Sequence, residues 1–147
     1  MTLRLLLGSG NRGKVAEYRR ILSGLDLELI GVDELADAPA EPAEDATTYE
    51  DNAIAKARAY LEATGIATVA DDSGLEVAAL GGAPGVRSRR YFGEDVPTAQ
   101  RNRMLLALLD GVEDRGARFV CVAALALPDG TVETFSGEVR GEIATAP

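Results

Sequence analysis

Histidine and tryptophan are absent from the 147 residues of this chain, and cysteine occurs once. Within these residues, the lack of histidine excludes catalytic triads with an imidazole base and zinc sites with histidine ligands. The single cysteine, Cys121, excludes an intrachain disulfide and is consistent with a reducing compartment. Because Cys121 lies inside the apolar run from Phe119 to Leu127, we expect a buried structural residue and not a catalytic thiol, which needs an electropositive, partly exposed setting.

Long hydrophobic segments are also lacking. The apolar run at 119–127 is far shorter than the roughly 18 residues that indicate a membrane span. The apolar stretch at the N-terminus ends at Gly8 and is too short to form the apolar region of a signal peptide. We therefore expect a cytoplasmic protein that has no membrane partner.

Positive charge is scarce, with 15 basic residues against 24 acidic ones and a net charge of −9. Such a balance repels the phosphate backbone, so the sequence disfavours nucleic acid as a partner. If the ligand is nevertheless a polyphosphate, something must offset the repulsion between like charges. A divalent metal ion is the usual solution.

Hydrophobic patterns predict strands alternating with helices, followed by a hairpin. The expected strands are residues 4–7, 25–31 and 66–70; the expected helices are 12–22, 48–63 and 98–109; the expected hairpin joins 119–127 to 131–139. Tyr18 lies on the apolar face of the first helix, and Thr48, with an acid three residues later, resembles a capping box for the second. Residues 33–45 are rich in alanine, proline and acid, and we expect an exposed connection there. The order of elements predicts one α/β domain over residues 1–147, with a mixed, twisted central sheet flanked by helices.

A glycine-rich loop, Gly8-Ser-Gly-Asn-Arg-Gly-Lys14, joins the first predicted strand to the first helix. Glycines let backbone N–H groups approach an anion, and the helix N-terminus and Lys14 add positive potential, so the loop suits phosphate. The string also resembles a P-loop, but Val15 replaces the serine or threonine that would bind magnesium there. A plain strand-to-helix turn with a surface lysine is the simplest alternative.

Acidic residues form the second candidate site. Asp71 and Asp72 directly follow the strand predicted at 66–70, and burying two adjacent carboxylates requires a cation or strong donors. Asn52 and Lys56 are one helical turn apart and share a face. Taken singly, Glu50 and Asp51 favour a simpler reading as solvated groups or helix caps. A basic cluster could either bind phosphate or be solvated, and the sequence leaves both open; it comprises Arg87, Arg89 and Arg90.

Several motifs occur together and in order: Ser9-Gly-Asn-Arg-Gly-Lys14, Thr48-Tyr-Glu-Asp-Asn-Ala-Ile-Ala-Lys-Ala57, Ala70-Asp-Asp-Ser-Gly-Leu-Glu-Val77 and Gly81-Gly-Ala-Pro-Gly-Val86. With this combination, the chain resembles the Ham1, or inosine triphosphate pyrophosphatase, family from Leu3 to its end. The resemblance implies an inosine triphosphatase-like α/β fold with the active site in a cleft. It also implies a homodimer.

The resemblance further implies a magnesium-dependent hydrolysis of non-canonical purine nucleoside triphosphates (inosine, deoxyinosine and xanthosine triphosphates) to the monophosphate and pyrophosphate. Asp72 matches the family's proton acceptor, and Glu44 and Asp72 match its Mg²⁺ ligands. The implied substrate-binding residues are Ser9, Gly10, Asn11, Arg12, Gly13, Lys14, Lys56, Asp71 and Ser73.

The departures from the family pattern are as specific as the matches. The family continues with an aromatic-Gly-Tyr-Asp-Pro motif, a lysine and a Ser-His-Arg motif that hold the purine, whereas this chain stops at Pro147. We therefore expect a C-terminally truncated chain that lacks the base-recognition segment. Two alternatives follow: a catalytically impaired nucleotide-binding remnant, or a Maf-like nucleotide pyrophosphatase.

Overall fold

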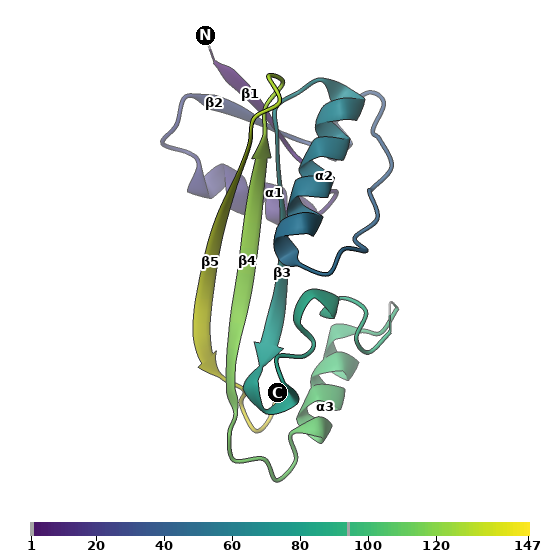
Figure 1. The fold of residues 1–147 in the computed structure, drawn as a ribbon, viewed down its shortest axis with the longest axis vertical. Coiled ribbons are helices and arrows are strands. Elements are labelled where there is room, and N and C mark those ends of the chain that lie inside the picture. Colours follow the sequence, from purple (N-terminus) through teal and green to yellow (C-terminus); the bar gives the residue numbers. More distant parts are fainter. Residues whose placement is uncertain (1, 94) are drawn as a thin grey trace. The chain divides into compact units, whose positions relative to one another are not determined.

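The computed structural model describes residues 2–93 and 95–147. Its elements follow one another as helices and strands that alternate in the first half (Figure 1). They are β1 (Leu3–Leu7), α1 (Arg12–Ile21), β2 (Leu27–Gly31), α2 (Tyr49–Thr64), β3 (Thr68–Val77), α3 (Thr98–Leu108), β4 (Gly116–Ala126) and β5 (Val132–Glu142), with short 3-10 turns at Val32–Glu34, Ala78–Leu80 and Gly85–Arg87.

The strands form a sheet of order β2-β1-β3-β4-β5. β1 lies parallel to both β2 and β3, with Leu5 opposite Leu29 and Leu6 opposite Thr68. A short turn joins β4 to β5, where the N–H of Leu127 donates to the carbonyl of Thr131. The sheet is therefore mixed, and the predicted α/β fold class and the predicted hairpin are confirmed.

Residue contacts divide the chain into two compact units, each described by itself. Unit 1 comprises residues 1–72 and 122–135, and unit 2 comprises residues 73–121 and 136–147. The single domain expected over residues 1–147 stays a prediction. Among the described residues, no helix is long and apolar enough to cross a membrane.

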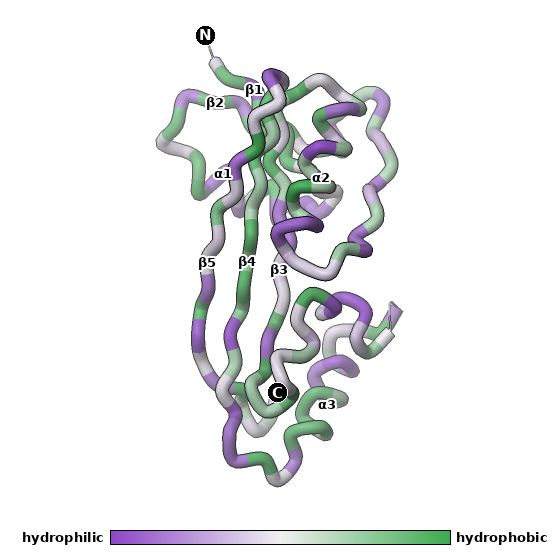
Figure 2. The backbone as a smooth tube through the Cα atoms, viewed as in Figure 1, coloured by the Kyte–Doolittle hydropathy of each residue, from purple (hydrophilic) through white to green (hydrophobic). Residues whose placement is uncertain are grey.

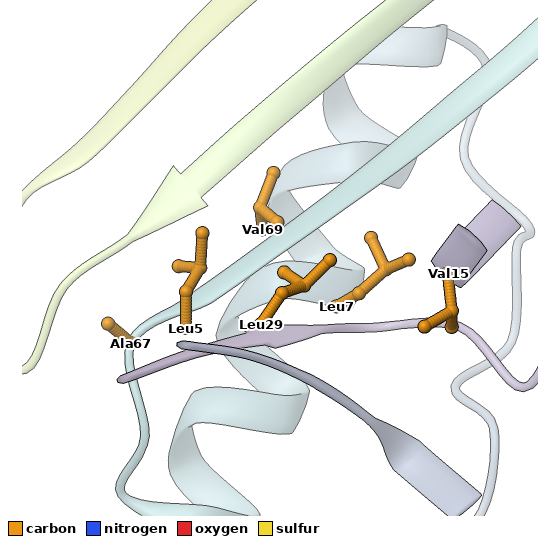
Figure 3. Packing of buried hydrophobic residues seen from close by; sticks show 6 residues of the cluster. All are labelled: Leu5, Leu7, Val15, Leu29, Ala67 and Val69. Atoms are coloured by element: carbon orange, nitrogen blue, oxygen red, sulfur yellow. The ribbon is translucent and has the colours of Figure 1, made fainter. Parts of the chain in front are cut away.

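The core of unit 1 is built around β1, whose residues alternate between two apolar clusters. Leu5 and Leu7 pack with Leu29 of β2 and Val15 of α1 on one face (Figure 3). Leu6 points to the opposite cluster, which contains Tyr60 of α2. A central parallel strand is buried on both faces, which explains why β1 reads as a continuous apolar run. Val15, the residue that breaks the P-loop pattern, is a core residue.

Helix α2 lies against the sheet through small side chains. Ala53 and Ala57 are fully buried and pack in one cluster with Ala124 and Ala126 of β4. The helix begins after Thr48, whose hydroxyl accepts a hydrogen bond from the N–H of Asp51 at 3.1 Å. It ends at Gly65, which has a φ of 70°, in the left-handed region that favours glycine. The predicted helix and its Thr48 cap are confirmed.

Strand β3 differs most from the prediction. The expected strand ended at Ala70, whereas β3 runs from Thr68 to Val77 and contains Asp71 and Asp72 in its middle. Polar residues usually mark the end of a buried strand, but here both aspartates are buried and bonded. The strand continues because helices supply these bonds.

One expectation in the second half differs from the structure. Cys121 is only partly buried in β4, not buried as predicted. At the end of α3, Leu108 is exposed, whereas Leu109, which follows the helix, is fully buried. β4 carries the long apolar run, whereas β5 is more polar and largely exposed (Figure 2).

Gly8 provides a test of the close approach between the end of β1 and α2. A Cβ atom at this position would lie 2.8 Å from Cδ2 of Tyr60 and 3.2 Å from Cβ of Ala70. We expect Gly8→Ala to lower the free energy of unfolding by about 1–3 kcal/mol, because the overpacked side chains must shift. Urea denaturation measures the change.

Gly10→Ala is the matched control, because a Cβ atom there meets no atom within 4 Å. This variant should retain the wild-type free energy of unfolding or gain slightly from the stiffer unfolded chain. Equal stability of the two variants would contradict the packing described for Gly8.

Candidate functional site

Asp71 and Asp72 stand at the centre of the candidate site in unit 1. They are 6% and 7% exposed. Adjacent strand residues point to opposite faces of a sheet, so Asp71 meets side chains of α1 while Asp72 meets a side chain of α2. Each buried carboxylate thus has its own donors, which is the compensation that burial of two neighbouring charges requires.

Helix α1 supplies the partners of Asp71. Lys14 Nζ forms an ion pair with Oδ1 of Asp71, and the Tyr18 hydroxyl donates to Oδ2 at 2.7 Å. Lys14 and Tyr18 are four residues apart on α1, so they project from one face. The sequence placed Tyr18 on the apolar face of this helix and missed its hydroxyl contact.

Helix α2 supplies the partners on the other side. Lys56 Nζ donates to the backbone carbonyl of Asp71 at 2.9 Å and lies 2.5 Å from Oε1 of Glu44. Asn52 Nδ2 donates to Oδ2 of Asp72 at 2.9 Å. The predicted shared face of Asn52 and Lys56 is confirmed, and it reaches both the Asp71–Asp72 strand and the segment that carries Glu44.

The glycine-rich loop is ordered by its own side chains. Asn11 caps α1: its Oδ1 accepts from the N–H of Gly13 at 2.9 Å and from the N–H of Lys14 at 3.2 Å. Ser9 Oγ accepts from the N–H of Asn11 at 3.1 Å. The cap fixes the start of α1, and with it the position of Lys14 over Asp71.

Other predicted site residues lie differently. The Arg12 guanidinium donates to Asp33 at 3.2 Å and is exposed. Glu50 is exposed and accepts from the Thr134 hydroxyl, which agrees with its simpler reading as a surface group. Ser73 directly follows Asp72 in β3 but belongs to unit 2, as do Arg87, Arg89 and Arg90.

Negative charge dominates the surroundings of the site. Burial raises the pKa of the Tyr60 hydroxyl, and the nearby charges of Glu41 and Glu44 raise it further. Lys14 is paired with the Asp71 carboxylate and Lys56 with that of Glu44, and the Asp72 carboxylate adds a third negative charge to the site. Both lysines are thus already neutralised, and a polyanion would need further positive charge to bind here.

The donor set fits a magnesium ion that shares its ligands with a phosphate. Within residues 2–93 and 95–147, no three His, Cys, Asp or Glu side chains gather in a group that could hold a metal. Mg²⁺, however, usually binds one or two carboxylates together with water and substrate phosphate oxygens. Glu44 and Asp72, both bonded to the same face of α2, would provide these two carboxylates. Their role as Mg²⁺ ligands stays a prediction.

Asn11 allows the structural and the electrostatic role of the loop to be separated. Asn11→Ala removes the cap of α1 and should lower the free energy of unfolding by about 0.5–2 kcal/mol. Asn11→Asp keeps a capping oxygen, so its stability should stay close to that of the wild type. The added negative charge should nevertheless weaken binding of inorganic triphosphate, measured by calorimetry in the presence of Mg²⁺. Unchanged triphosphate affinity in Asn11→Asp would argue against an anion site at this loop.

Comparison with known proteins agrees with these motifs. The model of the Ham1 family matches residues 5–147. A dITP/XTP pyrophosphatase of Syntrophobacter fumaroxidans is 46% identical over 97% of this chain and 61% of its own length. A protein of the same name from Symbiobacterium thermophilum is 47% identical over 98% of this chain and 72% of its own length.

Solved structures give the same result. The chain matches a HAM1 protein from Coxiella burnetii with a TM-score of 0.89 and 37% identity, over 99% of this chain and 75% of that one. It matches the Staphylococcus aureus Ham1 protein with a TM-score of 0.85 and 39% identity, over 97% of this chain and 73% of that one. By sequence and by fold, the chain belongs to the Ham1 family.

Proposed function

We propose that this protein hydrolyses non-canonical purine nucleoside triphosphates, namely inosine, deoxyinosine and xanthosine triphosphates, to the monophosphate and pyrophosphate. The relatives named dITP/XTP pyrophosphatase support both the reaction and the substrate class. The observation that carries the proposal is the convergence of Lys14 and Lys56 on the Asp71–Asp72 pair in unit 1. The family match favours this function over the Maf-like alternative.

The glycine-rich loop and the two lysines would bind the triphosphate. The exposed loop from Ser9 to Gly13 has room at Gly10, where no atom lies within 4 Å of an added Cβ, so an anion can approach its backbone. Lys14 and Lys56 would bring their ammonium groups to the phosphates, and because each is paired with a carboxylate, the surplus positive charge would come from a bound Mg²⁺. Asp71 would hold Lys14 in place, and Ser73 and Arg12 would add contacts to the substrate.

Asp72 would be the catalytic residue. As a general base, its carboxylate would accept a proton from the attacking water while the water oxygen bonds to the α-phosphorus. The bond from the α-phosphorus to the bridging oxygen then breaks, and pyrophosphate leaves with that electron pair. Glu44 and Asp72 would hold Mg²⁺, which when bound neutralises charge on the phosphate oxygens.

The remaining expectations concern the setting of the enzyme. We infer a cytoplasmic homodimer that uses neither nucleic acid nor membrane as a partner. The net charge of −9 supports the exclusion of nucleic acid, and the single cysteine agrees with a reducing compartment.

Asp72→Asn tests the role of Asp72 as the base, and the products released by the wild type test the type of reaction. With Mg²⁺ and inosine or xanthosine triphosphate, the wild type should release pyrophosphate and not orthophosphate. Asp72→Asn should still bind inorganic triphosphate, but its kcat should fall about 10²–10⁴-fold, because the amide cannot accept the proton. Enzyme-coupled assays for pyrophosphate and orthophosphate measure both products.

Asp51→Asn is the matched control. It removes one carboxylate from the first turn of α2, where Asp51 is exposed, and should leave kcat near the wild-type value. Release of orthophosphate alone by the wild type would contradict a pyrophosphohydrolase, and wild-type turnover by Asp72→Asn would contradict the assigned base. No turnover of any nucleotide would favour the catalytically impaired remnant.

A further inference from the structure

We propose that Asn52 is a positioning residue that fixes the spacing between the two carboxylates assigned to Mg²⁺, Glu44 and Asp72. The inference rests on the proposed function, because that function assigns the metal. The Asn52 side chain is 3% exposed, and both ends of its amide are bonded within unit 1. Oδ1 accepts from the N–H of Ala46 at 3.0 Å, and Nδ2 donates to Oδ2 of Asp72 at 2.9 Å.

The two bonds fix the orientation of the amide. A backbone N–H can only donate, so Oδ1 must face Ala46. Nδ2 then faces Asp72, whose Oδ2 accepts its hydrogen bond. Asparagine offers a donor and an acceptor on one rigid plane, so a single side chain satisfies both neighbours. A flipped amide would place N–H against N–H and oxygen against oxygen.

Ala46, whose N–H donates to Asn52 Oδ1, belongs to the segment that carries Glu44. Ala46 is two residues beyond Glu44, and Glu44 itself is paired with Lys56 at 2.5 Å. This segment is therefore held to α2 at two points one helical turn apart. It contains no helix or strand of its own between residues 35 and 48, so these two bonds help to fix where the Glu44 carboxylate lies.

Asp72, which accepts from Asn52 Nδ2, belongs to β3. Lys56 binds the backbone carbonyl of Asp71, and Asn52 binds the side chain of Asp72. The same two residues of α2 thus hold both ligand-bearing segments. Lys56 fixes the Glu44 side chain and the strand backbone, whereas Asn52 fixes the segment backbone and the Asp72 side chain. Without Asn52, the Asp72 carboxylate would lose a buried bond that orients it relative to Glu44.

Such a role predicts an effect on metal affinity in the absence of nucleotide. Loss of a group that orients a metal ligand typically lowers metal affinity 10–100-fold. Mn²⁺ is a suitable probe for a site of carboxylates, and its free concentration is measured directly by electron paramagnetic resonance. We expect Asn52→Ala and Asn52→Leu to raise the Mn²⁺ dissociation constant 10–100-fold in the full chain.

Gly65→Ala is the matched control for a general weakening of α2. It strains the left-handed end of the same helix, where the added Cβ meets no atom, and it leaves the Asn52 contacts in place. Its Mn²⁺ dissociation constant should stay within threefold of the wild-type value. Asn52→Ser, which keeps a small polar side chain, is measured alongside so that the test does not depend on one variant that fails to fold.

The kinetic readout separates positioning from catalysis. In the Asn52 variants, the Mg²⁺ concentration for half-maximal rate should rise, and saturating Mg²⁺ should restore much of kcat. Mg²⁺ should not restore Asp72→Asn, because that variant lacks the base itself. Folded Asn52 variants that bind Mn²⁺ within twofold of the wild type, or a wild type that binds no Mn²⁺, would overturn the positioning role. Weakened Mn²⁺ binding in a protein that releases no pyrophosphate would overturn only the proposed function.

Discussion

The burial of two adjacent carboxylates in the middle of β3 is the constraint on which the rest of unit 1 depends. Asp71 and Asp72 are almost fully removed from water, and two neighbouring charges repel each other strongly in a poorly polarisable interior. The pleat of the strand turns them to opposite faces. Each face must then present donors, and these come from α1 for Asp71 and from α2 for Asp72.

This demand explains the local sequences of both helices. α1 needs Lys14 and Tyr18 one turn apart, and its start is fixed by the Asn11 cap. α2 needs Asn52 and Lys56 one turn apart. Each is followed by an alanine, Ala53 or Ala57, that is small enough to let the helix lie close to the sheet. The charged groups of the site are thus held in place by apolar packing and by the side-chain caps at the starts of the two helices.

The balance of charge explains why the site would need a metal. Each lysine is bonded to an acidic partner, so a triphosphate meets a cluster with no surplus of positive charge. A cation that binds carboxylates and phosphate oxygens together would resolve this repulsion. The proposed ligands and the proposed Asn52 role are consequences of the same constraint.

The sequence predicted the parts of the structure that depend on local pattern. The helix cap at Thr48, the shared face of Asn52 and Lys56, and the hairpin all follow from spacing and turn residues. The continuation of β3 through Asp71 and Asp72 could not be predicted, because it depends on donors that lie far away along the chain. The Tyr18 contact was missed for the same reason: a tyrosine on an apolar helix face shows nothing of its hydroxyl partner. Asn11 could have been identified as the cap, since asparagine directly precedes the first helical residue.

The proposed mechanism requires that water attacks the α-phosphorus, next to Asp72. Turnover of inosine triphosphate in ¹⁸O-labelled water, followed by mass spectrometry of both products, tests this requirement directly. Attack at the α-phosphorus predicts one ¹⁸O atom in the nucleoside monophosphate and none in pyrophosphate. Label in pyrophosphate would place the attack on the β-phosphorus and contradict it.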